Sequence, residues 1–354
     1  MKSKLVFFLA TAAASMSLLF IPLIAEQQGA DKIQTGFIIS IYGFMSFVSY
    51  YVFGWLSDTR GRIFLIRLGL LASCIVFLMQ IFAQTPATLF MVRGLCGLSV
   101  GIYYSSLVIY GLERGNKVGK YTSYESLGFA AGTLLAGVIS IYYQIFALSS
   151  VFFFLGFLVS HRLEEKGFHK IKVPLLPLNL IRKNIRVYLP FLLRDVSAFS
   201  IWAFLPLYLS GLGADNLWIG ILYFINTGSQ FFFKQKLDRF NFSKLFSAGL
   251  LTSSMVFFSY LLPQNHFHVI PIHLLLGFSW ATLSVGAIGS LTYSNPEKAT
   301  VVGLFSSSRS AARIVGPLYS GLVTYFWGFD ALMIGSGTLT LIAFSIYLAS
   351  RGRI

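Results

Sequence analysis

The sequence predicts an all-α integral membrane protein with twelve transmembrane helices in two pseudo-symmetric six-helix bundles. Three observations support this: apolar runs broken by short polar turns, a one-sided distribution of basic residues, and an internal repeat. Of the 354 residues, 56% are hydrophobic and 11% are charged, whereas soluble domains are roughly 45–50% apolar and about 25% charged. Because a membrane-spanning helix needs about 20 apolar residues, the chain has room for twelve spans with short connections.

The apolar runs predict where the helices lie. We expect spans near residues 4–25, 35–56, 63–83, 87–112, 121–143, 144–161, 186–210, 216–235, 244–263, 267–292, 298–325 and 329–350. The first run follows Lys2 and Lys4, as in a secretion signal, but it continues to Ala25 and is long enough to cross a membrane. We therefore expect an uncleaved first helix.

The basic residues predict the orientation in the membrane. The formal net charge is +15, which by itself suggests a nucleic-acid partner. Most of the 27 Lys and Arg, Arg62 and Lys234 among them, fall on one predicted face, however, and only Lys32 falls on the other. Since positively charged loops remain in the cytoplasm, we expect a multi-pass cell-membrane protein with both termini cytoplasmic and no nucleic-acid partner.

An internal repeat relates the two halves of the chain in the same orientation. Identities recur 184 residues apart at Phe20 and Phe204, Pro22 and Pro206, Gly29 and Gly213, Asp31 and Asp215, and Gly36 and Gly220. Two parallel repeats with a central site between them are a transporter layout. We expect an N-terminal bundle of residues 1–160, a cytoplasmic linker of residues 161–184, and a C-terminal bundle of residues 185–354.

The turn between the second and third spans carries the clearest motif. Gly54, Asp58, Gly61 and Arg62 follow a G-x-L-x-D-x-x-G-R pattern that resembles the signature loop of the major facilitator superfamily, with Ile63 at the usual final basic position. The resemblance extends over the whole chain, through its twelve spans, repeat and linker. It implies the major facilitator fold and transport of a small molecule by alternating access.

The resemblance also implies a role for this turn as a latch between the halves when the transporter opens outward. Asp58 and Arg62 would then bind across the interface, with Glu113 as a candidate partner of Arg62, and Asp58 would face the start of the eleventh helix. We expect positive φ at Gly61 and close helix packing at Gly54. The alternative is a solvated loop of the positive face.

Four ionisable residues inside predicted spans are candidates for proton coupling: Arg93, Glu125, Asp195 and His273. Each is costly in lipid and should therefore face the protein interior. Arg93 belongs to a second motif-like segment, and the resemblance implicates such an arginine in coupling. The alternatives are an arginine bonded to backbone carbonyls, a structural ion pair at Asp195, inter-half salt bridges formed by Glu125, and a structural histidine.

A second group of residues is expected to line the substrate cavity. Arg309 and Arg313 are one helical turn apart and share a face, so they can present positive charge to an anionic substrate or to Asp195. The other candidates are polar or aromatic side chains within spans, for which the alternative is packing: Arg194, Asn226, Gln230 and Trp202.

The function predicted from these features is secondary active transport driven by a proton gradient. Resemblance to the drug-exporter branch favours efflux of an apolar or amphipathic compound. The fifth span, Gly128 to Gly137, resembles a glycine-rich antiporter motif with Thr133 in place of its proline. The alternatives are proton-coupled import of a polar metabolite, or a membrane sensor that does not transport.

No sequence feature predicts an enzyme or a cofactor. The chain has no phosphate-binding loop, metal-spaced His and Cys set or hydrolytic triad. The expected partners are a small-molecule substrate and the lipid bilayer, and we expect a monomer.

Overall fold

The structure is a computed structural model that describes residues 2–164, 178–295 and 298–351, with the backbone alone at residues 51, 55, 58–60, 118, 298–300, 302–303 and 351. Its N-terminal half comprises α1 (Lys2–Leu18), α2 (Ile21–Gln27), α3 (Lys32–Arg60), α4 (Arg62–Met79), η1 (Gln80–Phe82), α5 (Pro86–Glu113), α6 (Val118–Ile139) and α7 (Tyr142–Ser160). α1 with α2, and α4 with η1, each form one span. These helices match the first six predicted spans.

The C-terminal half begins after the linker. It comprises α8 (Leu178–Lys183), α9 (Ile185–Gly211), α10 (Asn216–Leu237), α11 (Phe242–Ser259), η2 (His266–His268), α12 (Val269–Ser294) and α13 (Lys298–Arg351). α13 consists of two helices joined at Gly328, whose φ is 80° and ψ is −173°. The predicted linker holds the short α8, and its residues 165–177 lie outside the described part of the chain.

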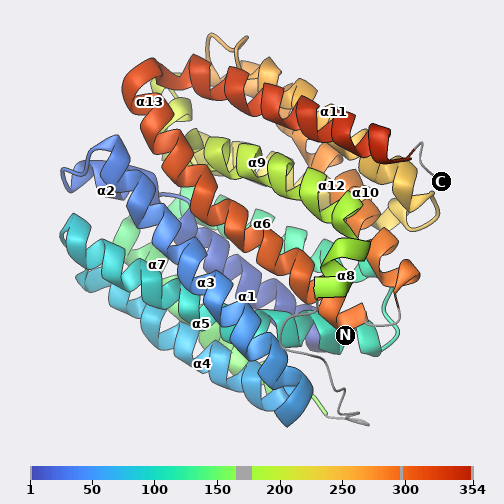
Figure 1. The fold of residues 1–354 in the computed structure, drawn as a ribbon. Helices are drawn as coiled ribbons and strands as arrows, with labels where there is room; N and C mark the ends of the chain where they lie inside the picture. Colours follow the sequence, from blue (N-terminus) through green and yellow to red (C-terminus); the bar gives the residue numbers. More distant parts are fainter. Residues whose placement is uncertain (1, 165–177, 296–297, 352–354) are drawn as a thin grey trace.

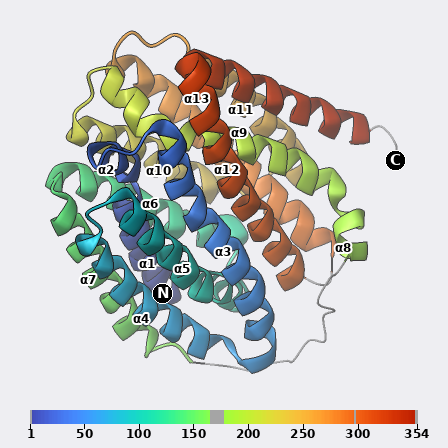
Figure 2. The ribbon, with the colours of Figure 1, turned by 60° about the vertical axis from the view of Figure 1, so that its left-hand side comes forward.

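The two halves pack side by side as helical bundles. In Figure 1 the blue-to-green helices α3, α4, α5 and α7 lie together, and the yellow-green-to-red helices α9, α11 and α13 lie together on the other side. The contact between the halves runs along α3 with α13 and α6 with α10 (Figure 2). The fold is therefore the predicted all-α arrangement of twelve spans.

Eight described helical segments are long and apolar enough to cross a membrane, and the last of them, Leu304–Ser350, contains both parts of α13. α6, α10 and α11 are outside this set. α6 and α10 contribute charged side chains to the centre of the molecule, Glu125 and Lys234. Polar residues at that depth mark functional positions in membrane proteins.

The predicted repeat is visible in the backbone geometry. Gly29 and Gly213 occupy equivalent turns with φ of 87° and 82°, a conformation that favours glycine. Asp31 and Asp215 begin the next helix in each half, where each carboxylate accepts a backbone N–H of the first turn at 2.7 and 2.8 Å. Identical turns at equivalent positions confirm the pseudo-symmetry of the two bundles.

The chain passes alternately between two ends of the molecule, the basic end and the opposite end. The basic end holds the turns at Gly61, Gly115 and Asp238, and the opposite end holds those at Gly29, Gly213 and Gly328. Most of the lysines and arginines of the predicted cytoplasmic face belong to the basic end.

At the opposite end the halves meet backbone to backbone. A Cβ built on Gly220 of α10 would lie 2.7 Å from the Cα of Gly137 in α6, and one built on Gly321 of α13 would lie 2.9 Å from the carbonyl oxygen of Lys32. The second contact also brings Gly321 against Gly36 of α3, so the two contacts are related by the repeat. A continuous apolar core drawn from both halves surrounds them, and this end is closed.

The signature turn lies at the basic end. Gly61 has φ of 95° and separates α3 from α4, as predicted. Arg62 is 8% exposed and forms an ion pair with Glu113 at the end of α5. The predicted partner is therefore confirmed, but both residues belong to the N-terminal half, so this ion pair does not cross the interface.

The expectation of close helix packing at Gly54 is wrong. Among the described residues, a Cβ built on Gly54 would meet no atom within 4 Å, because this part of α3 presents the glycine away from the neighbouring described helices. The side chain of Asp58 lies outside the described part of the chain, and so do the side chains of the first residues of α13. The predicted contact between them stays a prediction.

Candidate functional site

A central cavity of about 170 Å³ lies between the halves. Since a single water needs about 10–15 Å³ measured in this way, it has room for a small organic molecule. Its walls come from α1, α2, α3 and α6 of the N-terminal half and from α9, α10, α12 and α13 of the C-terminal half. A smaller hollow shares Glu125, Lys234, Trp280 and Arg309 with the cavity and extends toward Tyr104 on α5.

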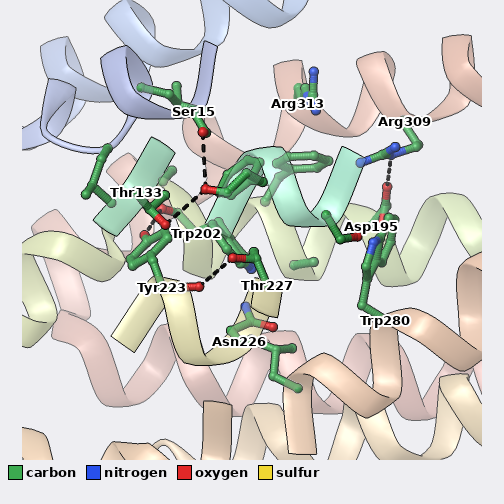
Figure 3. Close-up of a pocket in the computed structure, with 18 of the residues that line it drawn as sticks. Ser15, Thr133, Asp195, Trp202, Tyr223, Asn226, Thr227, Trp280, Arg309 and Arg313 are labelled. Atoms are coloured by element: carbon green, nitrogen blue, oxygen red, sulfur yellow. Dashed lines mark hydrogen bonds and ion pairs between the residues drawn. The ribbon is translucent and has the colours of Figure 1, made fainter. Parts of the chain in front are cut away.

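The most strongly charged wall of the cavity is formed by α9, α12 and α13. Asp195 is 1% exposed, and its Oδ1 accepts a hydrogen bond from Nη1 of Arg194 at 2.9 Å. Nε of Arg309 lies 3.7 Å from its Oδ2, as Figure 3 shows. The two guanidinium groups lie 5.0 and 4.7 Å from the ring centroid of Trp280. One carboxylate and one indole therefore hold both arginines.

Arg194 has a further fixed contact away from the cavity. Its Nε donates to Oγ of Ser253 at 2.9 Å, and that hydroxyl is hydrogen bonded to Ser279 at 2.6 Å. The equivalent hydroxyls of the first half, Ser73 and Ser99, form the same bond at 3.1 Å. The repeat thus supplies a hydroxyl pair in both halves, and only the second half uses it to hold a charged side chain.

α6 and α10 meet through a network of polar side chains. Nζ of the buried Lys234 donates to Oγ of Ser126 at 3.0 Å, and Ser126 donates to Oε1 of Gln230 at 3.2 Å. Gln230 in turn donates to Oδ1 of Asn226 at 3.1 Å. The amide nitrogen of Asn226 is buried and has no hydrogen-bond partner among the described residues. It is an unused donor on a cavity-lining side chain.

Among the described residues of the N-terminal half, Glu125 is the one acidic side chain that lines the cavity. Oε1 of Glu125 accepts a hydrogen bond from the hydroxyl of Tyr104 at 2.7 Å. Its repeat mate is Arg309, and both residues line the cavity. The same structural position therefore carries opposite charge in the two halves.

Aromatic rings form the cavity wall nearer the opposite end. Trp202 of α9 contacts Phe129 of α6 edge to face, with ring centroids 5.9 Å apart, and Tyr223 of α10 with centroids 4.6 Å apart. Around them are mainly aliphatic side chains of α1, α2 and α9. A mostly apolar lining with a few convergent polar groups is typical of ligand pockets.

Arg313 is placed by a close approach of two helices. A Cβ on Gly43 of α3 would lie 2.7 Å from the carbonyl oxygen of Arg313, so glycine is required there for α13 to pack as it does. The guanidinium of Arg313 lies 5.0 Å from the ring centroid of Phe199. Both side chains line the cavity.

The structure brings together most of the predicted site residues. Those that line the cavity are Glu125, Arg194, Asp195, Trp202, Asn226, Gln230, Arg309 and Arg313. Arg93 and His273, which the repeat pairs with each other, are both fully buried but do not line it.

Arg93 is packed inside the N-terminal half. Its guanidinium lies 4.5 Å from the ring centroid of Tyr42, and Nη1 donates to Oε1 of Gln80 at 3.3 Å. Gln80 is fixed by hydrogen bonds with Ser17. Of this cluster, the Tyr42 side chain lines the cavity. Arg93 is therefore connected to the cavity through the ring of Tyr42 and does not contact it directly.

His273 has the contacts of a structural histidine. Its Nδ1 lies 2.6 Å from the carbonyl oxygen of Leu222, and because a carbonyl only accepts, Nδ1 carries the proton. Tyr223 and Tyr260 pack edge-on against the ring. His273 does not line the cavity, so no direct contact supports its predicted role in proton coupling.

Sequence reasoning placed Lys234 on the basic face, and this placement is wrong. Lys234 is 2% exposed and lines the cavity. It is the fourth residue from the end of α10, so its position in the sequence looks like that of a loop lysine. Ser126, which receives its hydrogen bond, was also missed, because a serine in an apolar span carries no sequence signal of its own.

The second copy of the signature turn makes the contact between halves that the first copy was expected to make. Oδ1 of Asp238, at the end of α10, accepts a hydrogen bond from the backbone N–H of Gly119 at 3.2 Å. Gly119 lies in the first turn of α6, in the other half. A carboxylate at a helix N-terminus is stabilised by the helix dipole, so Asp238 ties the halves at the basic end.

We expect Asp238→Asn to loosen the basic end, because it removes a charge worth about 0.3–1 kcal/mol at a helix N-terminus. With Cys74 and Cys96 replaced by serine, a probe cysteine at Ser306, which lines the smaller hollow, should react faster with a water-soluble maleimide. Asp215→Asn is the matched control, because Asp215 caps a helix of its own half. Equal rates in both variants would contradict the latch.

The sequence of the chain is similar to a known protein family and to known transport proteins. The family model described as Major Facilitator Superfamily matches residues 5–296. Multidrug resistance protein MdtG of Salmonella typhimurium is 23% identical over 357 residues, covering 92% of this chain and 88% of the relative. Solute carrier family 22 member 18 of Rattus norvegicus is 24% identical over 362 residues, covering 91% and 87%.

Among solved structures, the crystal structure of the human organic anion transporter MFSD10 (TETRAN) matches with a TM-score of 0.81 and 17% sequence identity, covering 98% of each chain. At this identity the match shows the fold. Together with the family model, which spans most of the chain, it identifies a multi-pass membrane transporter of small molecules that is not an enzyme. The chain belongs to the Major Facilitator Superfamily.

Proposed function

We propose that this protein exports amphipathic small molecules from the cell in exchange for protons, by alternating access. The observation that carries the proposal is the central cavity, whose walls come from both halves and combine buried charges with aromatic rings. A site between two parallel repeats is exposed to one side or the other as the halves rock.

The contacts at the two ends of the molecule support alternating access. At the opposite end the halves touch through glycines, which form no side-chain bonds across the interface. At the basic end a charge-assisted hydrogen bond from Gly119 to Asp238 joins α6 and α10, in addition to the bonds of Ser126 with Lys234 and Gln230 nearer the centre. The glycine contacts separate without breaking a side-chain hydrogen bond. The apolar core near the opposite end is the larger closed surface, so opening there needs compensation from solute or proton binding.

Proton coupling is proposed for Asp195, with Glu125 as the second candidate. Asp195 holds Arg194 and Arg309 together, so a proton on its carboxylate would weaken both ion pairs at once. Glu125 lies on the part of the cavity wall that comes from the N-terminal half, where Tyr104 donates to it. Protonation of either carboxylate changes the charge that a solute meets in the cavity.

Export is favoured over import by similarity to the Salmonella relatives, which are named as multidrug resistance proteins. We propose that the protein is a monomer in the cell membrane. Its basic end and both termini would lie in the cytoplasm, because basic loops are retained there. Residues 1–160 and 185–354 are proposed as the two moving bundles and residues 161–184 as their linker. A proton-coupled importer of a polar metabolite is the alternative.

Transport in proteoliposomes tests this function. We expect an imposed pH gradient to drive accumulation of a permanently charged amphipathic compound, either 2-naphthalenesulfonate or 2-naphthyltrimethylammonium, and a protonophore to abolish it. Both compounds cross lipid slowly on their own, so empty liposomes are the control. Absence of gradient-driven flux for both compounds would overturn the proposal, and flux of small polar metabolites alone would favour the importer.

A further inference from the structure

The charges that line the central cavity do not balance. Among the described residues, its cationic side chains are Arg194, Lys234, Arg309 and Arg313, whereas its anionic side chains are Asp195 and Glu125. At neutral pH the lining therefore carries a surplus of positive charge. Uncompensated charge away from bulk water is expensive, and an anionic ligand would compensate it.

The surplus positive charge of the cavity lies on a subset of its cationic side chains. Arg194 is bound by Asp195 and by a serine hydroxyl, so its charge is already compensated. Among the described residues, no carboxylate lies within 4.0 Å of Arg313 or Lys234. Nε of Arg309 is buried, has no hydrogen-bond partner among these residues, and lies 3.7 Å from Asp195. Arg309 and Arg313 are thus the cavity arginines with capacity for another anion.

Arg309 and Arg313 are positioned to act together. They lie one turn apart on α13, which places their side chains on the same face of the helix. Each guanidinium lies against an aromatic ring of the cavity wall, Arg309 at 4.7 Å from the Trp280 centroid and Arg313 at 5.0 Å from that of Phe199. Ring contacts hold a guanidinium in place while leaving its N–H donors available for an acceptor.

The cavity is polar at one side and apolar at the other. On α6, Glu125 lies about 12 Å from Thr133 along the helix axis, at ~1.5 Å per residue, and Glu125 is the one nearer the basic end. On α9 the charged pair Arg194 and Asp195 is likewise nearer the basic end than Trp202. Figure 3 shows Asp195, Arg309 and Arg313 gathered on one side and Thr133, Trp202 and Tyr223 on the other.

The apolar side is suited to a flat hydrophobic body. Trp202 presents its ring beside Phe129 and Tyr223, and aliphatic side chains of α1 and α2 complete this part of the wall. Aromatic side chains contribute large apolar areas to ligand sites and prefer offset or edge contacts with other rings. An aromatic or alicyclic body fits this surface better than a sugar or a short polar solute.

We propose that the cavity is a binding site for amphipathic organic anions. One carboxylate or sulfonate binds Arg309 and Arg313, and the apolar body extends toward Trp202 and the opposite end. The inference rests on the proposed transport function for its physiological meaning. It restricts the substrate class of that function from amphipathic compounds in general to those with a single anionic group at one end.

Three ligands with one ring system test the charge preference. Isothermal titration calorimetry of the purified protein in detergent would compare 2-naphthalenesulfonate, 2-naphthalenemethanol and 2-naphthyltrimethylammonium. We expect the sulfonate to bind about tenfold more tightly than the alcohol, as for a charge-assisted contact, and the ammonium compound most weakly. Equal or tighter binding of the alcohol or the cation, or no binding of any of the three, would overturn the proposal.

Variants of Arg313 test the assigned group. Arg313→Gln should weaken sulfonate binding about tenfold and leave alcohol binding within about twofold of its original value, and Arg313→Lys should restore part of the loss. Arg186→Gln, at an exposed arginine of α9, is the control for net charge. An equal loss for sulfonate and alcohol would indicate a structural role for Arg313 and would overturn its assignment as an anion-binding residue.

The binding and flux experiments separate the two proposals. Preferential sulfonate binding without gradient-driven flux would leave the anion site standing and overturn the transport mechanism. Gradient-driven flux of the ammonium compound, with no preference for the sulfonate, would leave transport standing and overturn the anion site.

Discussion

Replacing Asp195 by asparagine should abolish the pH dependence of transport and lower the free energy of unfolding by about 3 kcal/mol. The stability loss follows because removing one partner of a buried ion pair leaves the other charge uncompensated, and here Arg194 and Arg309 both lose it. The loss of pH dependence follows because an amide cannot carry the proton. Flux at several external pH values and thermal unfolding in detergent measure the two effects.

Asp330→Asn is the matched control, because Asp330 is an exposed aspartate of α13 and surface substitutions are usually within about 0.5 kcal/mol. An Asp195→Asn variant that keeps the original pH dependence would exclude Asp195 as the proton carrier. Glu125 would then be the remaining carboxylate of the cavity, and Glu125→Gln would be the variant to measure.

A side chain at Gly220 should prevent the opposite end from closing. In Gly220→Val, the Cβ alone would lie 2.7 Å from Gly137 Cα and 2.8 Å from the carbonyl oxygen of Thr133, and backbone atoms cannot move aside as flexible side chains do. We expect transport to fall at least about tenfold, because interior overpacking costs typically 1–3 kcal/mol. Cysteines introduced near the opposite end should become more reactive.

Gly211→Val is the matched control for this prediction. Gly211 ends α9 at the same end of the molecule, and a Cβ built on it would meet no atom of the described residues within 4 Å. Its transport should remain close to that of the unchanged protein. If Gly220→Val transported at the same rate as Gly211→Val, the glycine contact would have no part in closing this end.

The sequence was sufficient for the fold because the relevant signals are local. Apolar length fixed the spans, and Gly29, Asp31 and their repeat mates encode turns that depend on neighbouring residues only. The charge of a residue inside a span also predicted burial correctly for Asp195 and Arg194. Each of these inferences follows from composition and spacing along one helix.

The contacts between helices required the structure. Arg194 and Asp195 are adjacent in sequence, where side chains point about 100° apart, yet they pair because Ser253 and Trp280 on other helices orient the guanidinium. Lys234 looked like a loop residue, but packing of α10 against α6 buries it beside Ser126. Tertiary packing decides which face of a helix contacts which neighbouring helix. These contacts could not be predicted from a single sequence.

The two halves contribute unequally to the charged residues of the cavity. Arg194, Lys234, Arg309 and Arg313 all belong to the C-terminal half, whereas the N-terminal half supplies only Glu125 among the charged cavity residues. A solute held by these cations would travel with one bundle and keep its polar contacts while the other bundle swings past it. In the proposed mechanism the C-terminal half would therefore bind the solute, and the N-terminal half would form the wall that moves relative to it.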